Sequence, residues 1–319
     1  MELARFALPL LRAQWVRRCN PSPPDLQRFH LLWPKNETFV EEIERSIVNV
    51  ALAALGDVGS GGEGPNGTGI RYFANQHKVK QFPSMHASCC EGQGTRLFGS
   101  LPLFLWAVSP PSSATLNVSV DIYAAGVLNL TMPTTCGGGV GLLAVSSLWP
   151  YNSNVVLDIV LSATCAEFAV SLRIPAWVAS TAVTITVNGT TWPAVGVPAS
   201  YVDVTLEWPA GTTTLALFLP MGLTSARYMG STQKDPYTRW SLLYGPTLMS
   251  FQGPWAATPI DCIVMPTGIN PADPGSWLVP ARDGNSLHWN VTGGSGVTVK
   301  PYFEVQADSE IFTNYPCFP

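Results

Sequence analysis

The chain has 319 residues and 38 charged side chains, 17 basic and 21 acidic, so its charged fraction of 12% is about half of the roughly 25% usual in soluble domains. Hydrophobic residues make up 46% of the chain, which is enough for a large core and argues against disorder. A net charge of −4 without a basic cluster argues against nucleic-acid binding, and the longest apolar run, residues 101–108, is too short to span a bilayer.

The charges are distributed unevenly along the chain. Residues 1–100 hold 20 of the 38 charges, and residues 101–319 hold the other 18. The hydrophobic period also changes near residue 100, from helical to strand-like. We therefore predict a helical domain over residues 1–108, a β-sandwich over 109–250, and a C-terminal β segment or second sandwich portion over 251–319.

An amphipathic helix is predicted between residues 38 and 56. Apolar residues recur there at helical spacing, and charged residues fill the other face of the helix. Thr38 and Glu41 form a capping-box pattern at its start, and Gly56 follows its last turn. Further helical stretches are expected at residues 3–18, where Pro9 interrupts the pattern, and from about residue 91 to residue 104.

Beyond residue 110 the hydrophobic period becomes two, which is typical of strands. Five such runs span residues 155–159, 168–174, 183–187, 202–206 and 215–219. Asn188 and Gly189 predict a type I′ hairpin turn between two strands. Ser, Thr and Asn on the outward positions favour an antiparallel sandwich with a neutral solvated face. The Pro- and Gly-rich residues 253–275 separate this sandwich from a final strand-like segment, residues 297–305.

The seven cysteines are an odd number scattered over a long chain, which does not resemble a disulfide framework. No signal peptide is visible, because the apolar residues between Arg5 and Arg12 are too few. Six of the 14 asparagines nevertheless lie in Asn-x-Ser/Thr acceptors, where chance predicts roughly two. These acceptors are Asn36, Asn66, Asn117, Asn129, Asn188 and Asn290. The excess favours a glycosylated protein of the secretory route or the extracellular space. The alternative is that a Thr-rich sandwich contains many such motifs by composition alone, without glycosylation.

The segment richest in reactive side chains is residues 76–96. It contains two histidines, the adjacent pair Cys89-Cys90, and Glu91. Two thiolates can bind zinc, and a cysteine with a lowered pKa becomes a nucleophile. The spacing alone leaves simpler interpretations open, because paired cysteines at a helix start commonly pack in a core. His86 could simply donate to a carbonyl, and Glu91 could be favoured there by the helix dipole.

Several motifs resemble glycoside hydrolase family 127. Residues 69–74 (GIRYFA) and 86–102 (HASCCEGQGTRLFGSLP) resemble the end of its catalytic domain. Residues 44–49 resemble its ER-x-x-x-N helix, residues 172–177 (LRIPAW) its LRIPxW strand, and residues 187–189 its VNG turn. Later matches are residues 219–221, 244–246 and 300–303, so the resemblance extends over nearly the whole chain.

This resemblance implies a multi-domain α+β protein, in which a helical remnant of an (α/α)6 toroid is followed by antiparallel, jelly-roll-like β-sandwich domains. It implies a retaining β-L-arabinofuranosidase that acts on a glycan containing a furanose sugar. Carried over to this sequence, Cys89 is the nucleophile, Cys89 and Cys90 are zinc ligands, and His86 and Glu91 are candidates for the substrate pocket. In the family a carboxyl group protonates the leaving oxygen and later activates water.

The sequence also departs from the family. The Glu-x-Cys motif that completes the zinc site is absent from residues 1–88, where Cys19 follows Arg17 and Arg18. Two of the four zinc ligands are therefore missing, as is the acid/base glutamate unless Glu91 replaces it. We accordingly expect the C-terminal portion of a longer hydrolase, in which the apolar stripe that includes Ile43 and Ile47 is left exposed.

Two alternatives without catalysis remain. One is a pseudoenzyme remnant in which Cys89 and Cys90 only pack. The other is a carbohydrate-binding module that stacks sugars on tryptophans of the β region, although most of these are expected to be packing residues. The tryptophans in question are Trp149, Trp177, Trp192, Trp208, Trp240, Trp255, Trp277 and Trp289.

Overall fold

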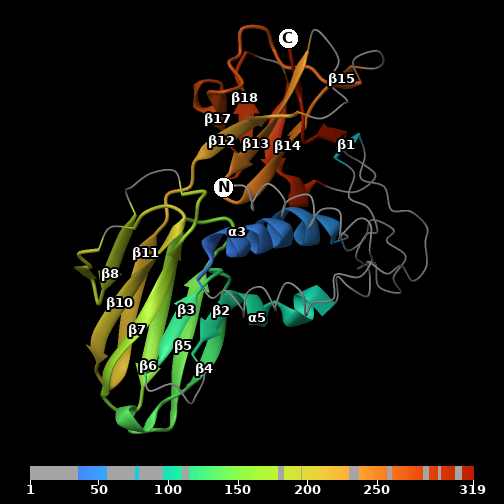
Figure 1. Ribbon diagram of the computed structural model, residues 1–319. Coiled ribbons are helices and arrows are strands. Elements are labelled where there is room, and N and C mark those ends of the chain that lie inside the picture. Colours follow the sequence, from blue (N-terminus) through green and yellow to red (C-terminus); the bar gives the residue numbers. More distant parts are fainter. Residues whose placement is uncertain are drawn as a thin grey trace. The chain divides into compact units, whose positions relative to one another are not determined.

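The computed structural model describes residues 35–55, 76–78, 96–109, 115–178, 183–194, 196–229, 237–256, 261–282, 287–293, 296–305 and 311–319. These residues form mostly antiparallel sheets with few helices (Figure 1). The chain divides into two compact units, the first made of residues 1–44 and 96–221 and the second of residues 45–95 and 222–319. This division differs from the predicted one, because the boundary falls at residue 221 rather than 250 and part of the helical segment belongs to each unit.

The first unit contains a four-stranded and a six-stranded sheet (Figure 1). The four-stranded sheet has the order β10 (Ser200–Trp208), β7 (Cys165–Ile174), β3 (Asn117–Val120) and β2 (Trp106–Val108). The six-stranded sheet has the order β4 (Gly126–Thr131), β5 (Val140–Ser147), β6 (Asn154–Leu161), β11 (Gly211–Phe218), β8 (Thr184–Val187) and β9 (Thr190–Thr191).

One strand pair departs from the predicted antiparallel arrangement. β3 and β7 run parallel, with Val118 opposite Val170 and Val120 opposite Leu172. The reason is the chain path, since β4, β5 and β6 all lie in the other sheet and the chain returns to β3 only after this crossover. The sandwich is therefore mostly, and not wholly, antiparallel.

The two sheets share one hydrophobic core. Val170 and Leu172 of the four-stranded sheet lie in the same buried cluster as Leu143, Leu157 and Leu215 of the six-stranded sheet. In a strand every second side chain points to the same face, so the alternating residues of both sheets meet between them. The five predicted runs are confirmed as β6, β7, β8, β10 and β11.

The predicted hairpin at residues 188–189 is confirmed. Asn188 and Gly189 both have positive φ angles, 47° and 80°, as a type I′ turn requires. The flanking residues Val187 and Thr190 pair across the antiparallel β8 and β9. Asn and Gly adopt this left-handed backbone at little cost, which explains why the pair fixes the turn.

The predicted helix is present as α3 (Glu37–Ser46), continued by the helical turns η1 (Ile47–Ala51) and η2 (Leu52–Ala54). It begins before Thr38, and the carbonyl of Asn36 accepts the first hydrogen bonds, so Thr38 is not the capping residue. The expectation of an exposed apolar stripe is wrong for Ile43 and Ile47, which are buried, while Leu8, Leu10 and Leu11 of that stripe lie outside the described residues. Residues 96–100 are helical and α5 spans Pro102–Leu105, which confirms the described part of the third helical stretch.

The second unit is built on a nine-stranded sheet. Its main path is β1 (His77–Lys78), β20 (Phe312–Thr313), β14 (Thr247–Gln252), β19 (Thr298–Pro301), β18 (Trp289–Val291) and β17 (Leu278–Pro280). Also in this sheet are β12 (Leu223–Arg227), β13 (Thr238–Tyr244) and β21 (Cys317–Phe318), while β15 (Trp255–Ala256) and β16 (Cys262–Ile263) form a separate pair. The predicted final strand is β19, which turns into the short helix η5 (Tyr302–Glu304).

Two disulfides correct the interpretation of the cysteines. Cys136 pairs with Cys165 in the first unit, and Cys262 pairs with Cys317 in the second. Cys136 ends the short helix η3 (Thr134–Cys136) between β4 and β5, while Cys165 begins β7, so the first disulfide links the two sheets. The partners are 29 and 55 residues apart in sequence, and only folding brings them together.

Within the described ranges, no helix combines the length and the apolar character needed to cross a membrane.

Candidate functional site

The predicted catalytic residues lie outside the part of the chain that the structure describes. This applies to Cys89, Cys90, His86 and Glu91, and also to Cys19. Among the described residues, no three or more His, Cys, Asp or Glu side chains are grouped so that they could hold a metal ion. The most concentrated polar chemistry that the structure does describe is a buried charge cluster in the first unit.

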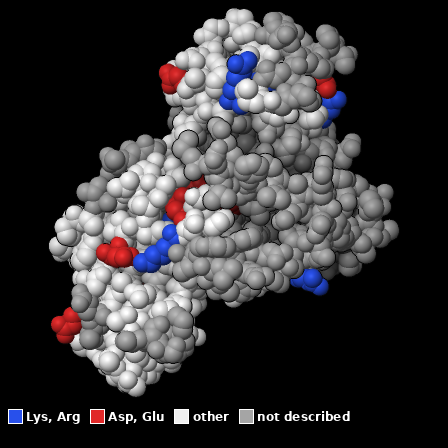
Figure 2. Space-filling model, viewed as in Figure 1, with Lys and Arg blue, Asp and Glu red and all other residues white. Residues whose placement is uncertain are grey.

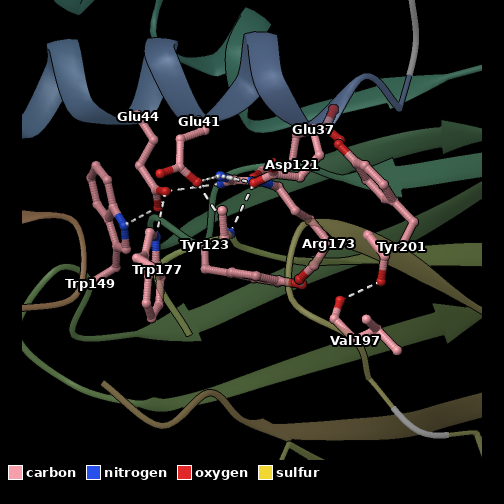
Figure 3. Close-up of polar contacts among 12 residues, drawn as sticks. Glu37, Glu41, Glu44, Asp121, Tyr123, Trp149, Arg173, Trp177, Val197 and Tyr201 are labelled. Carbon is pink, nitrogen blue, oxygen red and sulfur yellow. Dashed lines mark hydrogen bonds and ion pairs between the residues drawn. The ribbon is translucent and has the colours of Figure 1, made fainter. Parts of the chain in front are cut away.

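Arg173 is the centre of this cluster (Figure 3). Its side chain has no exposed surface, and its guanidinium contacts three carboxylates of α3. Nη1 lies 3.0 Å from Oε2 of Glu44, while Nη2 lies 3.0 Å from Oε1 of Glu37 and 3.6 Å from Oε2 of Glu41. We call these four residues the Arg173 cluster.

The spacing of the residues explains how the cluster forms. Glu37, Glu41 and Glu44 are separated by four and three residues, so they share one face of α3. On β7, Val170, Leu172 and Ile174 point into the core, which places Arg173 on the outer face of the four-stranded sheet. The carboxylate face of α3 therefore covers this face of the sheet, and Glu41 and Glu44 of the predicted charged face are buried.

Each carboxylate of the cluster also accepts hydrogen bonds from neutral donors. Oε2 of Glu44 accepts from Trp177 Nε1 at 2.7 Å, and Oε1 of Glu44 accepts from Trp149 Nε1 at 2.9 Å. The backbone N–H of Ala176 donates to both Glu37 and Glu41 at 3.1 Å. The carboxylates are thus satisfied without water, which lowers the cost of burying them.

A second group of polar residues extends the cluster along the sheet. Asp121 accepts hydrogen bonds from Tyr201 Oη at 2.7 Å and from Ser119 Oγ at 3.2 Å. Tyr123 Oη donates to the carbonyl of Arg173 at 2.6 Å, and Arg173 Nη1 donates to the carbonyl of Asp121 at 3.1 Å. Asp121 and Tyr123 are therefore linked to the Arg173 cluster by hydrogen bonds.

The electrostatics hold Arg173 as a cation and the two tyrosines as neutral phenols. Burial by itself lowers the pKa of Arg173, but the neighbouring carboxylates of Glu44, Glu37 and Glu41 outweigh it and raise that pKa above its ordinary value. Burial, reinforced by the charge of Asp121, raises the pKa of Tyr201. Burial also raises the pKa of Tyr123, against the opposing effect of Arg173. None of these groups changes its charge near neutral pH.

The chemical capacity of the cluster follows from its burial. Arg173 and Glu44 have no exposed surface, so neither can contact a substrate directly in this arrangement. The cluster is instead suited to hold α3 on the sandwich at one fixed position, because each of its charges has a specific partner. Glu37, Glu41, Glu44 and Arg173 thus join α3 to the four-stranded sheet.

Sequence reasoning placed Glu44 and Arg173 in two separate motifs without pairing them. Residues 44–49 and 172–177 were matched independently, and the structure brings Glu44 into contact with both Arg173 and Trp177. A usable signal was present, since Arg173 lies between the apolar residues Leu172 and Ile174 near the end of a predicted strand. A buried arginine requires carboxylate partners, and three carboxylates on one helical face can supply them.

A more exposed pair lies on the neighbouring strand. Asp203 on β10 accepts a hydrogen bond from Ser171 Oγ at 2.5 Å and from Lys35 Nζ at 3.0 Å. Partial burial alone raises the pKa of Asp203, but the hydrogen bonds from Ser171 and Lys35 outweigh it, so the pKa is lowered from its ordinary value.

The structure also describes His77, one histidine of the segment richest in reactive side chains. It lies on β1 opposite Thr313 and stacks on Trp255, with 6.3 Å between the ring centres. Burial lowers the pKa of His77, against the opposing charge of Asp261.

Five of the six glycosylation acceptors fall within the described residues. Asn117, Asn129 and Asn188 are exposed, whereas Asn36 and Asn290 are half-buried. Asn66 lies outside the described residues.

Half of the candidate sugar-stacking tryptophans are buried, as expected of packing residues. Trp177, Trp208, Trp277 and Trp289 are buried, and the other four predicted candidates are half-buried. Several form intramolecular hydrogen bonds through the indole N–H: Trp208 donates to the carbonyl of Phe168, and Trp277 donates to the carbonyl of Asn270. These tryptophans act as core and packing residues.

Comparison with known proteins identifies the sandwich. Residues 117–221, which run from β3 past β11, match the family model described as Beta-L-arabinofuranosidase, GH127 middle domain. No protein of the curated collection matches the chain. The resemblance to glycoside hydrolase family 127 is thereby confirmed, with the match covering the strands of the first unit from β3 to β11.

Solved structures share the fold. A protein titled glycoside hydrolase is 16% identical, with a TM-score of 0.66, and is matched over 92% of this chain and 50% of its own. A GH127 β-L-arabinofuranosidase from Geobacillus stearothermophilus T6 is 14% identical with a TM-score of 0.63, and a further GH127 β-arabinofuranosidase is 17% identical with a TM-score of 0.64. Both are matched over 92% of this chain and 48% of theirs, so the chain spans about half the length of these structures.

Proposed function

We propose that this chain is part of a glycan hydrolase of the β-L-arabinofuranosidase type. The proposal starts from the match of its sandwich to a family 127 model. The observation that carries the proposal is the family-model match over residues 117–221. The same residues contain Arg173 and Trp177, which bind the carboxylate of Glu44 from the helix that resembles the ER-x-x-x-N motif. Two motifs of the resemblance are therefore in physical contact.

Within this proposal the Arg173 cluster has a positioning role. Glu37, Glu41 and Glu44 fasten α3 to the sandwich through ion pairs of 3.0–3.6 Å that are shielded from water. A helix held in this way has one defined position, which is what a glycosidase needs from the scaffold of its site. The substrate class is a glycan that carries a furanose sugar.

The proposed chemistry uses Cys89 as the nucleophile. The Cys89 sulfur attacks the anomeric carbon, the glycosidic C–O bond breaks, and a carboxylic acid gives its proton to the leaving oxygen. The resulting carboxylate then takes a proton from water, whose oxygen attacks the same carbon. The C–S bond breaks, the thiolate and the carboxylic acid are restored, and the sugar keeps its original configuration. Glu91 is the carboxyl nearest in sequence for this acid/base role.

Zinc belongs to this proposal through Cys89 and Cys90. Two thiolates suit zinc in kind, and the bound ion would hold the Cys89 sulfur as a thiolate at neutral pH. Two ligands are too few, however, because a structural zinc site takes four. In the described residues the remaining cysteines are paired, Cys136 with Cys165 and Cys262 with Cys317, so they supply no thiolate.

The experiment is hydrolysis of an aryl β-L-arabinofuranoside by the purified chain, together with the zinc content of the protein. Cys89→Ser is expected to abolish hydrolysis, whereas Cys19→Ser, a cysteine outside the pair, is expected to leave it unchanged. Stoichiometric zinc that is lost in a double variant of Cys89 and Cys90 supports the ligand assignment. Hydrolysis that survives Cys89→Ser contradicts the nucleophile, and binding of the glycoside without any hydrolysis favours a non-catalytic remnant.

A further inference from the structure

The outer face of the six-stranded sheet bears exposed apolar side chains among neutral polar ones such as Asn129, Thr131 and Thr212. Val127 is 64% exposed, Val140 61%, Leu142 38% and Val160 36%. Along β4, β5, β6 and β11, all of whose residues the structure describes, Asp158 is the single charged residue, and its carboxylate accepts a hydrogen bond from Thr214 Oγ1 at 2.6 Å. Among the described residues on the face of the molecule shown in Figure 2, charged side chains are few. An apolar patch of this kind on a soluble protein is normally covered by something.

Asn129 lies on the edge strand β4, beside the exposed apolar residues of this face. It is directly opposite Leu142 in the β4–β5 pair, and Leu142 is opposite Val160 in the β5–β6 pair. Asn129, Leu142 and Val160 thus form one row across three strands, all exposed on the same side. Thr131, the hydroxyl residue of the acceptor Asn129-Leu130-Thr131, is also exposed and is opposite Val140.

The disulfides indicate the compartment in which the chain folds. Cys136 and Cys165 link the two sheets of the same sandwich, and Cys262 and Cys317 are paired in the second unit. Disulfides form in oxidising compartments such as the lumen of the endoplasmic reticulum and are rare in the cytosol. That lumen is also where glycans are attached to asparagine acceptors in secreted proteins.

We propose that Asn129 carries an N-linked glycan that covers the apolar outer face of the six-stranded sheet. In the transfer, Nδ2 of Asn129 forms a bond to C1 of the first N-acetylglucosamine of a lipid-diphosphate-linked oligosaccharide. The bond from C1 to the diphosphate oxygen breaks, the lipid diphosphate leaves with the electron pair, and the amide loses one proton. The attached sugars lie over Val127, Val140 and Leu142 and present hydroxyl groups to water. This inference is independent of the proposed hydrolytic activity.

The other described acceptors lack this combination of features. Asn36 and Asn290 are half-buried. At Asn117 the hydroxyl residue of the acceptor, Ser119, is buried and donates to Asp121. Asn188 is exposed, but it lies in the hairpin turn, where its side-chain oxygen accepts from the backbone N–H of Thr214.

The test is mass spectrometry of the tryptic or chymotryptic peptide that contains Asn129, from protein purified from its native cells before and after enzymatic deglycosylation. We expect the glycopeptide in the wild type, its loss in both Asn129→Gln and Thr131→Ala, and its retention in Thr131→Ser, which keeps the acceptor. An unmodified Asn129 in the wild type overturns the proposal.

The covering role is tested on the folded protein. Enzymatic removal of the glycan without denaturation, and the Asn129→Gln variant, are both expected to raise the fluorescence of a hydrophobic dye several-fold and to promote self-association. If Asn129→Gln fails to fold, the deglycosylated wild type still provides this measurement. A glycan on Asn129 whose removal changes neither dye binding nor association contradicts the covering role.

Discussion

The two sheets of the sandwich share one core but differ in their outer faces. The outer face of the four-stranded sheet is polar and contains Arg173, Asp121 and Tyr201, and α3 buries much of it. The outer face of the six-stranded sheet is neutral and largely apolar, and residues such as Val127 and Leu142 are exposed on it. The charged face is therefore the buried one and the apolar face the exposed one, the opposite of the usual partition.

The difference shows how partners, rather than side-chain polarity alone, decide burial. Each charge on the four-stranded face has a partner: Arg173 has three carboxylates, and Asp121 has the hydroxyl groups of Ser119 and Tyr201. Burial is tolerated when the charges are paired and hydrogen-bonded. The six-stranded face has few groups that require hydrogen-bond partners, and its exposed apolar side chains are the surface that the proposed glycan covers.

The largest expected effect comes from removing the central charge of the four-stranded face. Arg173→Met leaves Glu37, Glu41 and Glu44 without their counter-charge, and we expect the unfolding free energy of the sandwich to fall by about 3–5 kcal/mol. Native-state hydrogen exchange of β7 amides in increasing denaturant measures this. Glu207→Gln, which removes an exposed carboxylate on β10, serves as the control and is expected to change the value by less than about 0.5 kcal/mol. Equal stability of Arg173→Met and the wild type would show that the ion pairs do not hold α3.

The disulfide between the sheets is expected to contribute slightly less to the unfolding free energy than the charge of Arg173 does. Replacing Cys136 and Cys165 together by alanine removes a cross-link between residues 29 positions apart, which costs about 3–4 kcal/mol by loop-closure entropy. Native-state hydrogen exchange measures this loss, because it reports on the amides of each sheet separately. The matched control replaces Cys262 and Cys317 in the second unit, and it should leave exchange from the sandwich unchanged. An effect confined to one sheet contradicts the view that this bond couples both.

The edge of the polar face should show a small pH dependence. Because the pKa of Asp203 is lowered in the folded state, its ionised form stabilises the fold at pH values above its unfolded pKa of about 4. This contribution is lost as the pH falls through the lower folded-state pKa. Asp203→Asn should therefore destabilise the protein at pH 7 by at most about 1 kcal/mol, since the pair with Lys35 is partly exposed, and by nothing at strongly acidic pH. Chemical denaturation at several pH values measures the difference in unfolding free energy between the wild type and Asp203→Asn. A difference that grows as the pH falls contradicts the prediction.

The smallest effect is expected on the apolar outer face. Leu142→Thr replaces a partly exposed side chain on a strand, and the unfolding free energy should change by less than about 0.5 kcal/mol. Leu143→Ala, one residue further along β5 but pointing into the core, should cost about 2–5 kcal/mol. Equal costs for the two variants would mean that this outer face is covered by protein rather than by sugar or water.

Local patterns predicted much of the sandwich. The alternating runs gave β6, β7, β8, β10 and β11, because a strand with one buried face must place an apolar side chain at every second position. Asn188 and Gly189 gave the hairpin, because few residues other than these accept a left-handed backbone. The motif resemblance found the family whose model matches residues 117–221.

Tertiary structure alone decided which polar groups are buried and which cysteines pair. The helical period placed Glu41 and Glu44 away from Ile43, but only the packing of α3 on β7 brought them to Arg173, 129 residues further along the chain from Glu44. The same holds for the pairing of Cys136 with Cys165 and for the parallel pairing of β3 with β7. Periodicity assigns a side chain to a face because it depends on local backbone geometry. The neighbour that meets that face depends on the path of the whole chain.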